Sequence, residues 1–335
     1  MDVNIPARSK LALLGSLLCL TGSAQLSGYQ AGNQTAYTIE DHVNLVLLDV
    51  SVKDPRGGYV TGLTKDKFQV FEDGRRQTIT EFANIDTPVT VGLVVDNSGS
   101  MRFKRPEVVT AGLAFAKESN PRDEFFVVNF NNHVVSGLPE KVPFTDKIHQ
   151  LRAALYYGEP MGQTALYDAI AYSLEHLELS RQDKRTLIVV SDGGDNVSKT
   201  SLPELMKLID SSRATIYTVG LFDPDDRDRN PSVLRKLARV SGGEFFEPPA
   251  LDDVVPVFHK ISQDIRHRYS IGYVPDDVGT KRIVRSLRVV ATDNDGRKLV
   301  VRTRTAYTTA PFSELISEQK RNTVEAGHNV ATRHK

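Results

Sequence analysis

The sequence contains one cysteine, Cys19, in 335 residues. This cysteine lies in an apolar run, 11–20, which follows basic residues and precedes the small residues at 22–24. The order basic, apolar, small is typical of a secretory signal peptide, so we expect residues 1–24 to be removed on export. The mature chain then has no cysteine, which excludes disulfides, thiol catalysis and thiolate metal sites in it.

The sequence also lacks a long apolar run and an excess of charge of either sign. A membrane-spanning helix needs about 20 apolar residues, and the run at 11–20 is too short to serve as an anchor. A lipoprotein signal would have a small residue before the cysteine, where Leu18 stands.

The 42 basic residues match the 42 acidic ones, whereas nucleic-acid binders show a basic excess. We expect an exported protein, in the periplasm, at the cell surface or outside the cell, with no nucleic-acid partner and no transmembrane span in the mature chain.

Apolar strand-like and helix-like segments alternate between residues 88 and 267. The predicted strands are 89–95, 124–130, 185–191, 214–221 and a weaker 243–248, with a short antiparallel edge strand near 133–139. The predicted helices are 106–118, 164–179, 202–212, 232–241 and 251–265. This alternation predicts an α/β domain with a doubly wound, mostly parallel sheet of the Rossmann-like kind, covered by helices on both sides.

Two segments of β character flank this domain. Residues 38–87 and 268–309 show short alternating strands and Asp-Gly turns. Each segment alone has too little core to be stable, so we expect the two to pair into one small β-sandwich from which the α/β domain (88–267) is an insertion. Residues 25–37 are predicted to be a flexible lead, and the polar residues 310–335 a disordered tail.

Oxygen-bearing side chains follow several of the predicted strands. The stretch VGLVVDNSGSM (91–101) ends a strand with Asp96, Ser98 and Ser100, and two later loops carry Thr164 and Asp192. A strand that ends in a polar turn, with Ser100 capping the next helix, would explain the first loop alone. In an open parallel sheet, however, the carboxyl ends of the strands form the ligand-binding edge. Carboxylates and hydroxyls gathered there suit Mg²⁺, which binds oxygen ligands and usually keeps several waters.

These residues resemble the metal-ion-dependent adhesion site (MIDAS) of von Willebrand factor A domains. The family pattern is D-x-S-x-S, a distant Thr and a distant Asp within a DG pair, and all members are present here in the same order. The resemblance implies that Ser98, Ser100 and Thr164 act as direct ligands, with the aspartates acting largely through water. A first shell of neutral hydroxyls leaves the cation able to accept a carboxylate from a partner protein. Mn²⁺ suits the same oxygen ligands as Mg²⁺.

The segments on either side of the domain resemble those of the exported acidobacterial von Willebrand-related family, over residues 40–307. The resemblance predicts a bacterial, non-catalytic adhesion-type module that binds a partner's Asp or Glu. A structural or assembly component of the envelope with a stabilising metal is an alternative. A hydrolase is a further one, although Ser98 and Ser100 lack the G-x-S-x-G elbow and no histidine is placed as an obvious base.

An acidic loop, 222–230, follows the strand 214–221 and should reach the same edge of the sheet. Its acidic residues could shape which partner is accepted or bind a second cation such as Ca²⁺, whereas a solvated loop balanced by its own arginines needs no ligand. These residues are Asp223, Asp225, Asp226 and Asp228.

Overall fold

The computed structural model describes residues 45–223, 229–276 and 283–321. These residues all belong to one unit, 43–335. The predicted signal peptide (1–24) and lead (25–37) lie outside the described residues. Within the described ranges, no helix has both the length and the apolar character needed to cross a membrane.

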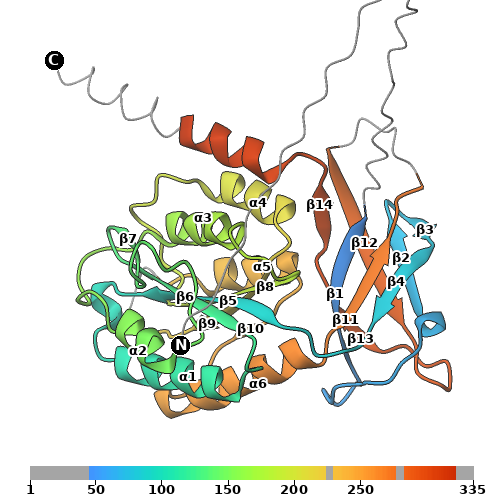
Figure 1. The fold of residues 1–335 in the computed structure, drawn as a ribbon, viewed down its shortest axis with the longest axis horizontal. Helices are drawn as coiled ribbons and strands as arrows, with labels where there is room; N and C mark the ends of the chain where they lie inside the picture. The colour runs from blue at the N-terminus through green and yellow to red at the C-terminus, as the bar shows by residue number, and fades with distance from the viewer. Residues whose placement is uncertain (1–44, 224–228, 277–282, 322–335) are drawn as a thin grey trace, which may run out of the picture. The chain divides into compact units, whose positions relative to one another are not determined.

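A six-stranded sheet with the order β10-β9-β8-β5-β6-β7 forms the centre of the α/β part (Figure 1). Its strands are β5 (Val89–Asp96), β6 (Glu124–Phe130), β7 (Val134–Ser136), β8 (Lys184–Ser191), β9 (Thr215–Gly220) and β10 (Phe245–Phe246). All neighbours are parallel except β7, which pairs with β6 in the antiparallel sense. The predicted α/β fold and its antiparallel edge strand are confirmed.

Six helices cover the two faces of this sheet. They are α1 (Arg105–Glu118), α2 (Ile148–Leu155), α3 (Leu166–Leu177), α4 (Leu202–Ser211), α5 (Pro231–Ser241) and α6 (Val254–Arg266). Helices α1, α2 and α6 lie on one face, and α3, α4 and α5 lie on the other (Figure 1). The sheet is therefore buried from both sides, which is what the apolar runs in its central strands predict.

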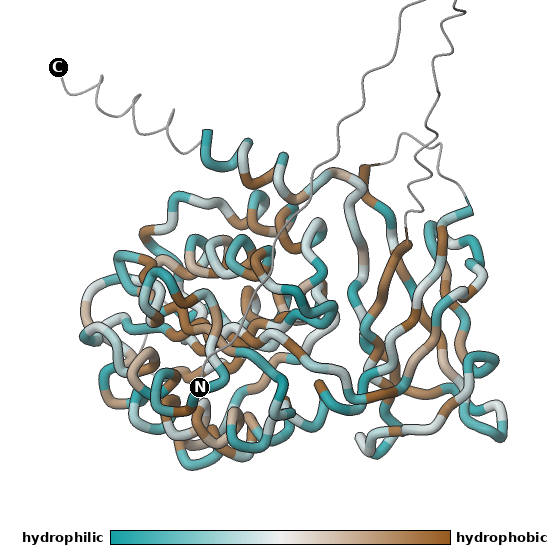
Figure 2. Tube along the Cα trace, viewed as in Figure 1, coloured by the Kyte–Doolittle hydropathy of each residue, from teal (hydrophilic) through white to brown (hydrophobic). Residues whose placement is uncertain are grey.

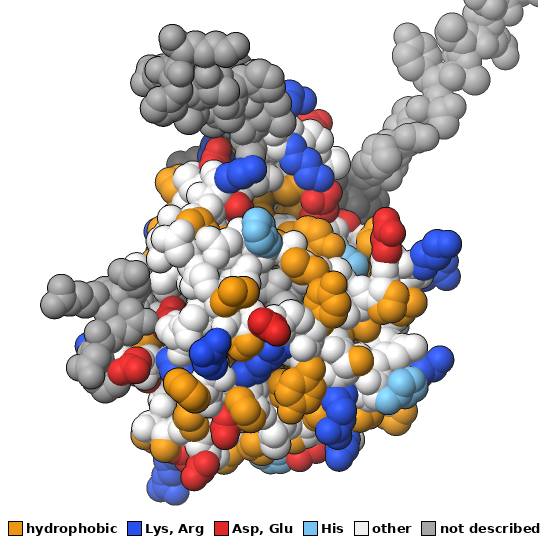
Figure 3. All heavy atoms as spheres, turned by 90° about the vertical axis from the view of Figure 1, so that its left-hand side faces the viewer, with side chains coloured by type: hydrophobic (Ala, Val, Ile, Leu, Met, Phe, Trp, Pro, Cys, Tyr) orange, Lys and Arg blue, Asp and Glu red, His pale blue; other side chains and the backbone are white. Residues whose placement is uncertain are grey.

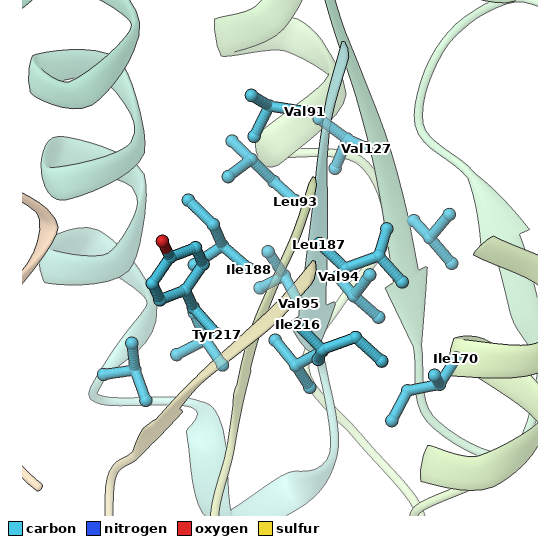
Figure 4. Packing of buried hydrophobic residues seen from close by; sticks show 14 of the residues in the cluster. Val91, Leu93, Val94, Val95, Val127, Ile170, Leu187, Ile188, Ile216 and Tyr217 are labelled. Atoms are coloured by element: carbon cyan, nitrogen blue, oxygen red, sulfur yellow. The ribbon is translucent and has the colours of Figure 1, made fainter. Parts of the chain in front are cut away.

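Strand β5 is the centre of the hydrophobic core. Every one of its residues is buried, and brown, hydrophobic segments mark the central strands and the inner sides of the helices in Figure 2. Val91, Leu93, Val94 and Val95 pack among side chains from β6, β8, β9 and α3 (Figure 4). Because β5 is fixed along its whole length, the polar residues that follow it start from a rigid position.

The β segments on either side of the α/β part form two four-stranded sheets. One has the order β13-β1-β11-β4 and the other β14-β12-β2-β3. The strands are β1 (Val46–Lys53), β2 (Phe68–Glu72), β3 (Arg75–Gln77), β4 (Ile79–Ala83), β11 (Tyr269–Tyr273), β12 (Val284–Ala291), β13 (Val300–Arg302) and β14 (Ala306–Thr308). Each sheet mixes strands from before and after the α/β part, and together they enclose a second core. The exact domain limits remain a prediction.

The end of the described chain differs from the sequence-based expectation. Residues 312–321, expected to be part of a disordered tail, form a helix. Phe312, Leu315 and Ile316 share one face of it, and they pack against the core of the α/β part. Their spacing of three and four residues is the helical signal within an otherwise polar stretch.

A buried ionic network joins the first β-sheet to the α/β part. Asp264 in α6 accepts hydrogen bonds from Ser51 in β1 (2.6 Å), Tyr217 in β9 (2.5 Å) and Arg268 (2.8 Å). The Asp264 side chain is completely buried, and that of Arg268 is 4% exposed. Arg268 also donates to the main-chain oxygen of Gly242 (2.8 Å). The hydrogen bonds of this buried charge pair are thus completed by groups from three other segments, at Ser51, Tyr217 and Gly242.

Candidate metal centre

The register of the central sheet brings two of the predicted site residues side by side. Val95 of β5 pairs with Val190 of β8, so the next residue of each strand ends at the same edge. There the hydroxyl of Ser191 donates to Asp96 Oδ2 (2.7 Å). Asp192 follows directly and is 3% exposed, whereas Asp96 is 1% exposed. Two carboxylates thus lie buried at the carboxyl edge of the sheet.

The loop after β5 folds back over these carboxylates. Its first turn is closed by the main-chain N–H of Ser98, which donates to Asp96 Oδ1 (2.8 Å). The hydroxyls of Ser98 and Ser100 lie 3.1 Å apart, and Ser100 donates to Asp192 Oδ2 (2.6 Å). Ser98 is buried, but Ser100 is exposed. The structure therefore joins four of the five predicted site residues in one chain of hydrogen bonds that opens to solvent at Ser100.

The main chain of Thr164 is tied to the loop that follows Asp192. Its N–H donates to Asn196 Oδ1 (2.9 Å), and its oxygen accepts from the N–H of Asn196 (3.0 Å). On the other side, the N–H of Gly99 donates to the oxygen of Gly162 (3.2 Å). The segment before α3 is thus tied to the loops that follow both β5 and β8. Thr164 itself is 6% exposed.

The two buried carboxylates, Asp96 and Asp192, bring negative charge to the site that no nearby positive charge balances in the described part of the chain. Burial, together with the nearby Asp192 carboxylate, raises the pKa of Asp96 to about 6. Within the described ranges, no Lys, Arg or His forms an ion pair with Asp96 or Asp192. No described group of three or more His, Cys, Asp or Glu residues could hold a metal, so any cation here would rely on hydroxyl oxygens as well. Two carboxylates and three hydroxyls form a donor set that fits a hard divalent cation.

Arg105, which the sequence analysis did not single out, positions the segment between α2 and Thr164. Its buried guanidinium donates to the main-chain oxygens of Leu155 (3.2 Å), Tyr157 (3.0 Å) and Gly158 (2.6 Å). Three carbonyl acceptors in one segment suit the five fixed donors of a guanidinium. Nothing in the sequence around Arg105 indicates this role, because its acceptors are main-chain atoms about 50 residues away.

The acidic loop that was expected at this edge is described only in part. Asp223 is exposed, whereas Asp225, Asp226 and Asp228 lie outside the described residues. The second cation, Ca²⁺, and the role of this loop in partner choice remain predictions.

Gly193, next to Asp192, packs closely against the main chain of Asn230, and a substitution can test this packing. Its φ is +81°, and a Cβ there would lie 2.5 Å from the main-chain oxygen of Asn230. We expect Gly193→Ala to lower the free energy of unfolding by about 1–3 kcal/mol, through backbone strain and this contact. Gly57→Ala is the matched control, because Gly57 has a φ of +89° and nothing within 4 Å of a Cβ. Equal losses in urea unfolding of the two variants would contradict the predicted close packing at Gly193.

Comparisons with known proteins support the family resemblance over the centre of the chain. Residues 91–194 match the family model of the von Willebrand factor type A domain. This stretch contains all five predicted metal-site residues. No curated protein matches the chain.

Several solved structures are similar in fold. A von Willebrand factor type A protein from Catenulispora acidiphila has 14% identity and a TM-score of 0.49, over 81% of this chain and 75% of that one. An aerotolerance-related membrane protein from Bacteroides fragilis, with multiple mutations to serines, has 16% identity and a TM-score of 0.43, over 53% and 98%. The vWF domain of the type V pili tip protein Mfa5 from Porphyromonas gingivalis has 15% identity and a TM-score of 0.42, over 54% and 96%. By the family model, the central part of this chain, residues 91–194, is thus similar to von Willebrand factor type A domains.

Proposed function

We propose that the chain is an exported, metal-dependent protein-binding module. A divalent cation, Mg²⁺ or Mn²⁺, would be held by Asp96, Ser98, Ser100, Thr164 and Asp192 and would bind an Asp or Glu side chain of a partner protein. The observation that carries the proposal is a pair of buried carboxylates, Asp96 and Asp192, at the open edge of the sheet. No basic residue in the described part of the chain forms an ion pair with them, and serine hydroxyls hydrogen bond to both.

In this proposal the two aspartates orient the loops, and the hydroxyl residues bind the cation directly. Asp96 accepts hydrogen bonds from the Ser98 N–H and the Ser191 hydroxyl, so its charge fixes the loop and orients the hydroxyls. Asp192 accepts from Ser100 and from the N–H of Gly194 (3.1 Å). Hydroxyl ligands carry no charge, and a cation bound mainly by them attracts a further carboxylate. The exposed position of Ser100 is where such a carboxylate would arrive.

One feature favours binding over catalysis. No described His, Lys or Cys hydrogen bonds to Ser98 or Ser100, whereas an activated serine needs an adjacent base. A structural role, with the cation stabilising the loops, is the alternative.

Crosslinking in the native cell envelope tests the proposal against this alternative. We expect partners to be crosslinked in Mg²⁺, and to be lost both in chelator and in an Asp96→Asn variant, because the partner's carboxylate needs the cation. The Asp183→Asn variant is the matched control, since Asp183 is exposed at the opposite edge of the sheet. Crosslinks that survive chelator would favour the structural role.

A further inference from the structure

Large hydrophobic side chains are exposed on two segments that adjoin the candidate metal site. Phe103 is 84% exposed, Tyr156 52%, Tyr157 54% and Met161 58%. Phe103 lies three residues after Ser100, and the other three lie between the end of α2 and Thr164. Figure 3 looks onto the side of the molecule where α1, α2 and β7 lie, and hydrophobic side chains occupy the middle of this face between single charged ones. We call these four residues the apolar rim.

The main chain of the rim is fixed to the metal loop. The N–H of Met161 donates to the oxygen of Asn97 (2.8 Å), and Asn97 Nδ2 donates to the oxygen of Tyr157 (3.2 Å). The Arg105 guanidinium donates hydrogen bonds to three carbonyl oxygens of the segment 155–158. It also lies 5.9 Å from the ring centre of Tyr156. The exposed side chains are thus carried on an anchored backbone, which lowers the entropy lost on binding.

We propose, on the basis of the proposed function, that the apolar rim selects the partner. The preferred ligand is a protein segment in which the Asp or Glu that reaches the cation is flanked, within one or two residues, by a large aromatic or aliphatic side chain. The carboxylate supplies the polar contact at the centre of the interface. The flanking apolar side chain packs against Phe103 and Tyr157, the type of residue that dominates binding energy at interfaces.

A peptide-display selection on the purified protein tests this inference. The library is selected in Mg²⁺ and eluted with chelator, and the eluted peptides are sequenced and their affinities measured. We expect an Asp or Glu with an adjacent aromatic or large aliphatic residue. A Phe103→Ser, Tyr157→Ser double variant should bind these peptides at least tenfold more weakly, because truncating aromatic residues that pack against a bound partner has effects of this size. Its Mg²⁺ affinity and its Tm should match those of the wild type.

Leu179→Ser is the matched control. Leu179 is 63% exposed, but it follows α3 at the opposite edge of the sheet from the metal loop, and its replacement should leave peptide affinity unchanged. Acidic, chelator-sensitive peptides without an apolar neighbour, or equal affinity for the rim variant, would overturn the inference and leave the proposed function standing. Selected peptides that lack acidic residues and resist chelator, or no selected peptides at all, would count against the proposed function itself.

Discussion

Replacing Asp264 by alanine is expected to lower the free energy of unfolding by about 3–5 kcal/mol, because the change leaves the buried Arg268 without its partner. Arg268 is buried, so water cannot replace the lost carboxylate. The same change removes the acceptor of the Ser51 and Tyr217 hydroxyls. Equilibrium unfolding in urea, monitored by circular dichroism at pH 7, measures the loss.

The pH dependence of the free energy of unfolding tests whether the charge of Asp264 stabilises the fold. Burial alone would raise the pKa of Asp264, but the Arg268 charge and the hydrogen bonds from Ser51 and Tyr217 outweigh it and hold the pKa well below the usual 3.8. The stabilisation by this carboxylate is therefore complete above about pH 4 and is lost as the pH falls further. An Asp264→Asn variant lacks this dependence, so its stability difference from the wild type should shrink below pH 4. A difference that stays constant down to pH 2 would show that the charge of Asp264 does not stabilise the fold.

Replacing Asp96 by asparagine should have opposite effects on the metal-free and the metal-loaded protein. The pKa of Asp96 is raised to about 6, so its ionised form destabilises the folded chain at pH 7.5, and the neutral amide should make the metal-free protein at least as stable as the wild type. Mg²⁺ at 100 times its Kd should stabilise the wild type by about 2.7 kcal/mol. The variant should lose most of this gain, since orienting carboxylates contribute roughly 10- to 100-fold in metal affinity.

Thermal unfolding with Mg²⁺ and with chelator measures both effects in one experiment. Asp183→Asn, which removes an exposed carboxylate at the opposite edge of the sheet, should keep the full Mg²⁺ response. If Asp96→Asn destabilised the metal-free protein and kept the Mg²⁺ response, Asp96 would be a structural residue only.

The sequence was sufficient to predict the central sheet and the edge at which the candidate site residues Asp96 and Asp192 lie. The unbroken apolar run before Asp96 indicates a strand buried on both faces, and a parallel sheet gathers the residues that follow such strands. This is why Asp96, Ser98, Ser100 and Asp192 can be grouped from the sequence alone. Thr164 was predicted from the order of the motif, and in the structure its main chain is hydrogen-bonded to Asn196, four residues after Asp192.

Other features depend on tertiary contacts that leave little trace in the sequence. Arg105 binds carbonyl oxygens, which every residue has, so no pattern identifies its acceptors. Helix α2 (Ile148–Leu155) was not predicted, because eight residues give little periodicity. In the helix 312–321, the three apolar residues are outnumbered by polar ones, and they become a helix face only because the α/β core lies beneath them.

Titration of Mg²⁺ into chelator-stripped protein, followed by isothermal calorimetry, tests the metal site most directly. We expect uptake of about one Mg²⁺ per chain by the wild type and by Asp183→Asn, with a Kd at least tenfold weaker for Asp96→Asn. Absence of Mg²⁺ and Mn²⁺ uptake by the wild type, or equal uptake by the wild type and Asp96→Asn, would contradict the assignment of the β5 and β8 loops as a metal site.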